Sequence, residues 1–200
     1  MERGCEKGNS REDRRGGEED GHKRGSIFHG RDQGADLEVP RVHGLRLQRG
    51  DKALAGDAPV AVVDASVAVK WYLPERSHEK AIRLRDLHVR GSINLAAPTL
   101  IYYEVANALR YHRIFKLSPH DVATAVRALK ALRIARMPVE AVWALASRIS
   151  YDLDISMYDA VYVSMAASRQ APFITSDGTL AERMKMTGRN VTLLDDWKPD

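Results

Sequence analysis

The sequence predicts one α/β domain, in which a central parallel sheet lies between two layers of helices, preceded by a disordered N-terminal tail. The composition changes near residue 58. Residues 1–58 contain 11 of the 14 glycines, and their 12 basic residues balance 12 acidic ones. So polar a segment buries too little apolar surface to offset its chain entropy. From residue 59 to residue 200, short apolar runs alternate with amphipathic segments, which is typical of α/β domains.

The first half of the domain begins with a strand at 59–63, because this run is apolar and β-branched and suits burial on both faces. Ser66 is expected to cap a short helix that Pro74 ends. A charged amphipathic helix, a second buried strand, a helix opened by Pro98 and a helix with a Ser-Pro start follow. These elements after the first strand are predicted at 67–73, 77–89, 93–97, 99–114 and 119–132.

The second half continues the alternation and ends on a strand. A short strand and a helix come first, and Ser156 then precedes another helix, followed by a strand, a short helix and the last strand. Since alternating elements of this kind form right-handed crossovers, the strands are expected to run parallel, with functional residues beyond their carboxyl ends. The elements are predicted at 133–137, 139–149, 158–168, 172–175, 179–185 and 191–194.

Charge and cysteine content limit the classes of function. The formal net charge of +4 belongs entirely to residues 59–200, which is a mild bias towards acidic partners such as nucleic acid. The only cysteine, Cys5, lies in the tail, so a disulfide framework or a cysteine metal site is excluded. No apolar run is long enough for a membrane span or a signal peptide. We therefore expect a cytoplasmic protein without a membrane partner.

Four acids occupy positions where a core or an element end is predicted. Asp64 directly follows the first strand, and Asp177 follows the strand that ends at Thr175. Glu104 lies within an apolar helical segment, and Asp159 opens a helix whose inner face is apolar. Because the carboxyl ends of parallel strands meet at one edge of the sheet, these acids are expected to converge.

Each acid also has a purely structural interpretation. Asp64, Asp159 and Asp177 stand where helix-capping or loop residues are common, and Ser156 precedes Asp159 at capping distance. Glu104 fits such an interpretation less well, because a half-buried carboxylate without a partner is costly. No single acid is specific, and the prediction of a site rests on their joint placement.

Gathered carboxylates repel one another and raise their own pKa values unless a cation lies between them. An all-oxygen site favours Mg²⁺ or Mn²⁺. Zinc is disfavoured because the domain has no cysteine and its histidines lack paired ligand spacing. Such a cation would lower the pKa of a bound water and stabilise a phosphate under in-line attack.

Four segments together resemble a known family. Residues 62–71, 98–109, 158–166 and 173–181 are similar to the successive motifs of PIN domains, most closely those of VapC-type toxins and their archaeal relatives. The similarity spans about residues 60–196. It implies an α/β/α sandwich and a Mg²⁺- or Mn²⁺-dependent endoribonuclease that hydrolyses RNA phosphodiesters with a metal-activated water. Carried over residue by residue, the catalytic and metal-binding acids fall on Asp64, Glu104, Asp159 and Asp177.

The resemblance also implies supporting residues and partners. Ser66 matches a small hydroxyl residue near the site, Thr175 the threonine before the last acid, and Asn107 a polar position near the glutamate. A buried strand hydroxyl remains the alternative for Thr175. Toxins of this family act with a small antitoxin protein and form dimers, so both an antitoxin and a homodimer are expected.

Basic residues near the predicted site are candidates for holding RNA phosphates. Their alternative role is a solvated helix end. The candidates are Lys70, Arg110, Arg113 and Lys116.

Other functions remain open at this point. PIN domains also serve in RNA processing and as DNA-flap nucleases, and a non-catalytic module that binds a partner is a third possibility. A phosphatase with an aspartyl nucleophile also begins with a strand followed by aspartate. That chemistry needs a second aspartate two residues on, where this chain has Ser66.

Overall fold

The computed structural model describes residues 58–198, so the predicted tail at 1–58, apart from residue 58, lies outside the described residues. Five parallel strands form one sheet in the order β3-β2-β1-β4-β5, which confirms the predicted parallel sheet. Val62 of β1 pairs with Ala96 of β2 on one side and with Phe173 of β4 on the other. The strands are β1 (Val60–Val63), β2 (Asn94–Pro98), β3 (Ala135–Met137), β4 (Phe173–Thr175) and β5 (Val191–Leu193).

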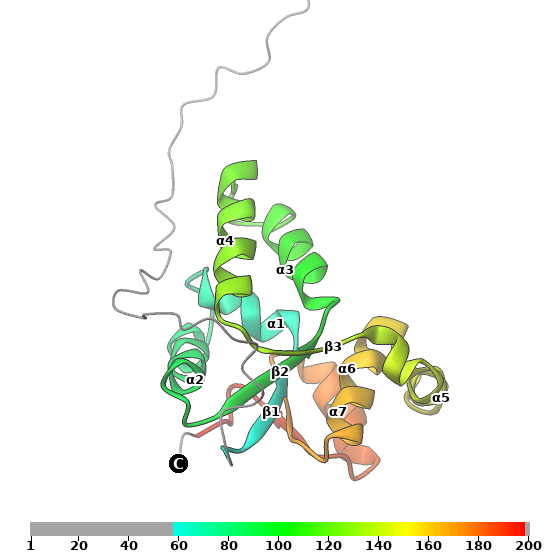
Figure 1. Cartoon of the computed structure of the whole chain (residues 1–200). Coiled ribbons are helices and arrows are strands. Elements are labelled where there is room, and N and C mark those ends of the chain that lie inside the picture. The colour runs from blue at the N-terminus through cyan, green and yellow to red at the C-terminus, as the bar shows by residue number, and fades with distance from the viewer. Residues whose placement is uncertain (1–57, 199–200) are drawn as a thin grey trace, which may run out of the picture. The chain divides into compact units, whose positions relative to one another are not determined.

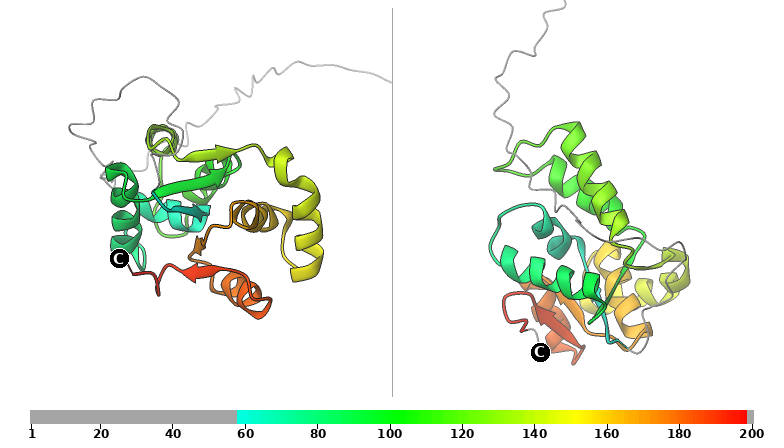
Figure 2. Two further views of the ribbon diagram at one scale, coloured as in Figure 1. Left: turned by 60° about the horizontal axis from the view of Figure 1, so that its bottom comes forward. Right: turned by 60° about the vertical axis from the view of Figure 1, so that its left-hand side comes forward.

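Helices cover both faces of the sheet (Figure 1). The chain moves outward from β1 to β3 through α1 to α4, and then returns to β4 and β5 through α5 to α7. Because crossovers are right-handed, this reversal places the two groups of helices on opposite faces (Figure 2). Within residues 58–198, no helix is long and apolar enough to cross a bilayer. The helices are α1 (Ala65–Ala68), η1 (Val69–Trp71), α2 (His78–Arg90), α3 (Ile101–Arg110), α4 (Pro119–Ala131), η2 (Val139–Val142), α5 (Trp143–Leu153), α6 (Met157–Ser168) and α7 (Gly178–Met186).

The core forms where the central strands meet helices from both layers. β1 and β2 are buried almost throughout, as their β-branched and small side chains predict. Trp71, Tyr162 and Phe173 are the bulkiest fully buried side chains. The Tyr162 and Phe173 rings lie 6.3 Å apart between α6 and β4, so α6 is fixed against the middle of the sheet.

The first helix starts earlier than predicted, because Asp64 and not Ser66 is its cap. The Asp64 side chain accepts from the Val67 backbone N–H, and α1 begins at Ala65. Ser66 turns its hydroxyl towards Asp64 instead. As the cap of α1, the Asp64 carboxylate stays at the end of the sheet, where the Thr175 hydroxyl also binds it.

Two other helices also differ from the prediction at their ends. α3 ends at Arg110. Beyond it, the backbone N–H groups of Ile114 and Phe115 donate to His112 Nδ1 in place of the carbonyls of a continuing helix. Pro98 ends β2 and does not open a helix, and Thr99 N donates to Met137 O in the adjacent strand.

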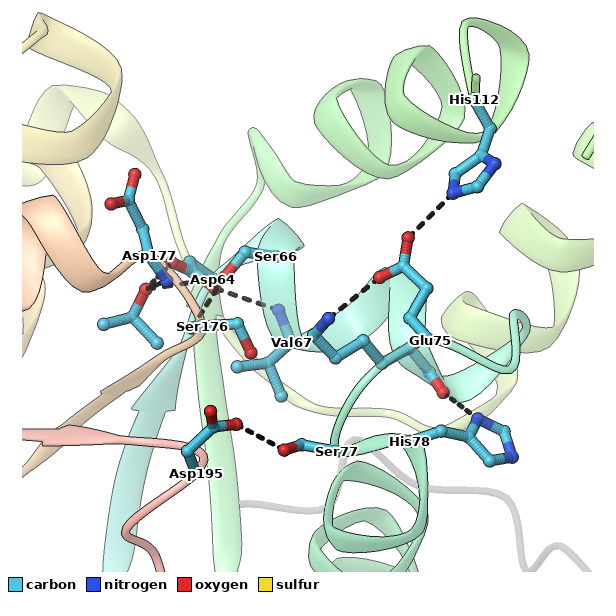
Figure 3. A network of polar contacts seen from close by, with 12 residues as sticks. Asp64, Ser66, Val67, Glu75, Ser77, His78, His112, Ser176, Asp177 and Asp195 are labelled. Carbon is cyan, nitrogen blue, oxygen red and sulfur yellow. Dashed lines mark hydrogen bonds and ion pairs between the residues drawn. The ribbon is translucent and has the colours of Figure 1, made fainter. Parts of the chain in front are cut away.

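The segment after β5 is fastened to the loop before α2. The Ser77 hydroxyl and the Arg76 guanidinium both contact the Asp195 carboxylate, the latter at 2.8 Å, and Lys80 donates to the Asp195 backbone carbonyl. Figure 3 shows the Ser77–Asp195 contact beneath the end of β1. This contact joins the edge of the sheet at β5 to the helical layer around α2.

Candidate active site

Two of the predicted acids, Asp64 and Asp177, lie at the place where the strand order reverses. The chain leaves β1 towards β2 on one side and reaches β4 on the other, so the carboxyl ends of β1 and β4 form the switch point of the sheet. Asp64 directly follows β1, and Asp177 comes two residues after β4. Open α/β sheets bind their ligands at such a point.

Asp64 is buried and accepts three hydrogen bonds (Figure 3). Its Oδ1 accepts from Ser66 Oγ at 2.6 Å and from Val67 N at 3.1 Å, and its Oδ2 accepts from Thr175 Oγ1 at 2.5 Å. Burial raises the pKa of Asp64 to about 6, although these hydrogen bonds oppose the shift. The carboxylate is therefore held firmly in a place where its negative charge is poorly solvated.

The two hydroxyls that bind Asp64 also hold the loop after β4. Ser66 Oγ accepts the Ser176 backbone N–H at 2.8 Å, and Thr175 Oγ1 accepts that of Asp177 at 3.0 Å. The ends of β1 and β4 are thus joined by hydroxyl bridges as well as by the sheet. Ser66 and Thr175, which were predicted to support the site, both contact its central acid.

Glu104 is half-buried on α3, and its partner comes from α6. The buried Tyr162 hydroxyl donates to Glu104 Oε2. Burial, together with the charges of Asp64 and Asp159, raises the pKa of Glu104 to about 7, although the hydrogen bond from Tyr162 opposes the shift. Tyr162 in turn has its pKa raised by burial and by the neighbouring Glu104, so it stays a hydrogen-bond donor.

Asp159 completes a group of three acids. Its charge raises the pKa values of both Asp64 and Glu104, so the three carboxylates are electrostatic neighbours although they come from β1, α3 and α6. The Asp159 side chain accepts from Ser156 Oγ at 2.7 Å, and its backbone N–H donates to that hydroxyl. The capping interpretation therefore holds for this residue, and its charge also reaches the other two acids.

Asp177 stands slightly apart from the other three acids. It is exposed, and its carboxylate caps α7 by accepting from Leu180 N at 3.0 Å. The Asp177 backbone N–H donates to the Thr175 hydroxyl, and the same hydroxyl donates to Asp64. Asp177 is connected to the other acids only through this hydroxyl, among the hydrogen bonds of the described residues.

The chemistry of the group suits a hard divalent cation. All its donors are oxygens, and the raised pKa values of Asp64 and Glu104 mean that their negative charge lacks compensation. In the arrangement described for residues 58–198, no three acid, histidine or cysteine side chains are gathered closely enough to hold a metal.

The predicted phosphate-binding residues fall into two groups. Arg110 is exposed at the end of α3, and Arg113 and Lys116 are exposed in the segment that follows it. None of the three has a carboxylate partner in the part of the chain that the structure describes. Lys70 is largely buried and donates to Glu75 Oε2 at 2.9 Å, and Glu75 also binds His112 at 2.7 Å (Figure 3). Lys70 is thus engaged within the protein.

Sequence reasoning missed Tyr162 as the partner of Glu104. It placed both residues on inward-facing helical positions but did not pair them. A signal was present, because a buried tyrosine hydroxyl needs an acceptor and a buried carboxylate needs a donor. Asn107, the remaining predicted residue, is exposed one turn after Glu104 on α3.

The chain is similar to several known proteins. The family model described as PIN domain matches residues 61–185. Ribonuclease VapC3 of Pyrobaculum aerophilum is 34% identical over 134 residues, covering 61% of this chain and 92% of that relative. A crystal structure of PAE2754 from the same organism has 23% identity and a TM-score of 0.48, covering 70% of this chain and 93% of its own. Mycobacterium tuberculosis VapC20, described as a toxin that cleaves the sarcin-ricin loop, has 14% identity and a TM-score of 0.47, covering 64% and 95%.

Proposed function

Because the chain belongs to the PIN domain family, we propose that it is a divalent-metal-dependent endoribonuclease whose active site is the acid group at the end of β1. The relative named Ribonuclease VapC3 supports RNA as the substrate. The observation that carries the proposal is that Asp64, Glu104 and Asp159, three acids from separate elements, influence one another electrostatically. A fold has no structural need to bring three acids together, because their mutual repulsion destabilises it.

Each acid has its own means of being held in place. Ser66 and Thr175 orient Asp64, Tyr162 orients Glu104, and the start of α6 fixes Asp159. These carboxylates are the proposed ligands of Mg²⁺ or Mn²⁺, with Asp177 as the outermost acid. When bound, the cation supplies charge to a phosphate under attack and lowers the pKa of water. Arg110, Arg113 and Lys116 are proposed to hold RNA phosphates beyond the site.

The biological setting that we propose is a toxin–antitoxin pair in the cytoplasm. It rests on the resemblance to VapC proteins, of which Ribonuclease VapC3 is 34% identical to this chain over 134 residues. The antitoxin would be a small protein that covers the acid group, and the nuclease would act as a homodimer. A test is co-purification of the chain with the product of a neighbouring small gene, followed by recovery of RNA cleavage when the two are separated.

Removal of divalent metal is expected to stop RNA cleavage completely and reversibly. The acids need a cation to compensate their charge, so EDTA should leave the fold intact while it removes activity. The measurement is cleavage of a labelled RNA in Mg²⁺ or Mn²⁺, then with excess EDTA, then after metal is restored. Cleavage that continues in EDTA would contradict the metal-dependent mechanism.

Replacing Tyr162 with Phe is expected to lower RNA cleavage by about 10- to 100-fold, the usual effect of losing a hydrogen-bond partner of a metal ligand. The ring stays packed on Phe173, so the melting temperature should change little. Glu104 loses its donor and no longer has a fixed orientation. Tyr102→Phe, on the same helix as Glu104, is the control. Unchanged cleavage by the Tyr162→Phe protein would show that Glu104 needs no such support.

A further inference from the structure

Two exposed tyrosines border the acid group. Tyr103 immediately precedes Glu104 on α3, and Tyr158 immediately precedes Asp159 on α6. Their exposed fractions are 78% and 63%, and neither belongs to the core. A single exposed aromatic residue is ordinary. Two such residues, each next to a different acid of one cluster, are not explained by the packing of the fold.

Tyr103 continues into a polar and basic stripe along α3. Asn107 and Arg110 follow it by four and seven residues, so the three side chains share one face of the helix. Asn107 is also three residues from Glu104, which places this stripe directly beside the acid group. At the end of the helix the Arg110 guanidinium lies 5.0 Å from the centre of the Tyr111 ring. The stripe thus combines aromatic rings, an amide and a cation.

The charges on this surface select among possible occupants. Arg110, Arg113 and Lys116 are exposed cations without acidic partners among residues 58–198. Rings interleaved with cations are typical of surfaces that bind single-stranded nucleic acid, where bases stack on the rings and phosphates meet the cations. A second copy of the chain fits less well, because covering this surface would bury the Glu104 and Asp159 carboxylates against protein.

We propose that Tyr103 and Tyr158 stack on the unpaired bases that flank the phosphate at the acid group, and that they thereby select single-stranded RNA. This inference rests on the proposed nuclease function and adds two specificity residues to it. Tyr103 acts from α3 and Tyr158 from α6, so the two rings come from separate elements. Base-paired RNA is excluded, because its bases are stacked on one another and cannot reach the rings. The stacking is tolerant of sequence, since every base has a flat face.

The test compares alanine and phenylalanine at both positions. Tyr103→Ala and Tyr158→Ala remove the ring, whereas the Phe variants keep the ring and lose only the hydroxyl. Trp143→Ala is the matched control, because Trp143 is also an exposed aromatic residue, at 58%. It is the first residue of α5, at the opposite end of that helix from the turn that leads into α6. Two readouts are used. One is KM and kcat for cleavage of a single-stranded RNA in Mg²⁺, and the other is the Kd for the same fluorescent RNA in EDTA.

Each alanine variant is expected to raise KM and Kd by roughly 5- to 150-fold, the effect of losing one stacked base, with a smaller change in kcat. The Phe variants and Trp143→Ala should match the parent, and the RNA annealed to its complement should bind poorly to all of them. Parent-like values in both alanine variants would overturn the proposal, as would an equal loss in the Phe variants. A fall in molecular mass of the alanine variants with unchanged Kd would assign the tyrosines to an interface between copies instead.

The two readouts separate this inference from the proposed function. A parent protein that binds single-stranded RNA through the tyrosines but never cleaves it would refute the nuclease function alone. A parent that cleaves RNA equally well in single and double strands would refute the tyrosine proposal and leave the nuclease function standing.

Discussion

The Asp64→Asn protein is expected to fold normally and to lose RNA cleavage by more than about 100-fold. Loss of a hydrogen-bond partner of a metal ligand already costs about 10- to 100-fold, so loss of the charged ligand itself should cost more. Asparagine keeps the shape of the side chain and can still bind Ser66, Val67 and Thr175. The measurement is cleavage of labelled RNA at saturating Mn²⁺. Asp86→Asn, with the same change of charge on α2, is the control.

The stability of the same variant provides an independent check. Burial raises the pKa of Asp64 from 3.8 to about 6, so between these values the folded protein holds a proton that the unfolded chain has released. The contribution of Asp64 to stability therefore falls as pH rises through this range, and the ionised carboxylate opposes folding above it. In EDTA at pH 8, Asp64→Asn should melt at least as high as the parent. Mn²⁺ should raise the melting temperature of the parent only.

A clear fall in melting temperature in EDTA would mean that Asp64 serves mainly as a helix cap. Retained cleavage would show that the site lies elsewhere. Expression in bacteria adds a further comparison, because a toxin should arrest growth and its Asp64→Asn form should not.

Replacing Trp71 with Ala is expected to destabilise the domain by about 3–5 kcal/mol, the usual cost of removing a buried large aromatic side chain. Trp71 is 1% exposed and its indole N–H donates to Ala81 O at 3.0 Å, so it joins η1 to α2. Since domains are typically stable by about 5–15 kcal/mol, much of the stability would be lost. Urea denaturation measures the change, and Trp143→Ala on the surface should cost less than about 1 kcal/mol. A loss below that value for Trp71→Ala would show that its cavity collapses.

Sequence alone predicted the parallel sheet, which the structure confirms. It also predicted that four acids converge, and three of them, Asp64, Glu104 and Asp159, influence one another electrostatically. Alternation of strands and helices dictates parallel pairing, and parallel pairing places Asp64 at the edge where Asp159 and Glu104 arrive. The details that sequence did not predict depend on contacts between distant segments. Tyr162 meets Glu104 across 58 positions, and no local pattern records that pairing.

The same limit explains the errors at element ends. Ser66 and Asp64 are both good caps, and only the neighbouring Thr175 hydroxyl shows why the aspartate takes that role while the serine bridges to Ser176. Lys70 has the charge of a phosphate ligand, but the turn after Pro74 brings Glu75 to it first. Local preference identifies the candidates, and tertiary contact decides between them.

The hydroxyl bridges between β1 and β4 also bear on when the protein becomes active during its synthesis. Asp64 is made early, whereas Thr175, which binds it, and β4, which pairs with β1, are made near the end of the chain. The Asp64 side of the site therefore lacks its β4 partners until almost all of the chain has been made. For the proposed ribonuclease, this order of assembly would delay activity until the end of synthesis.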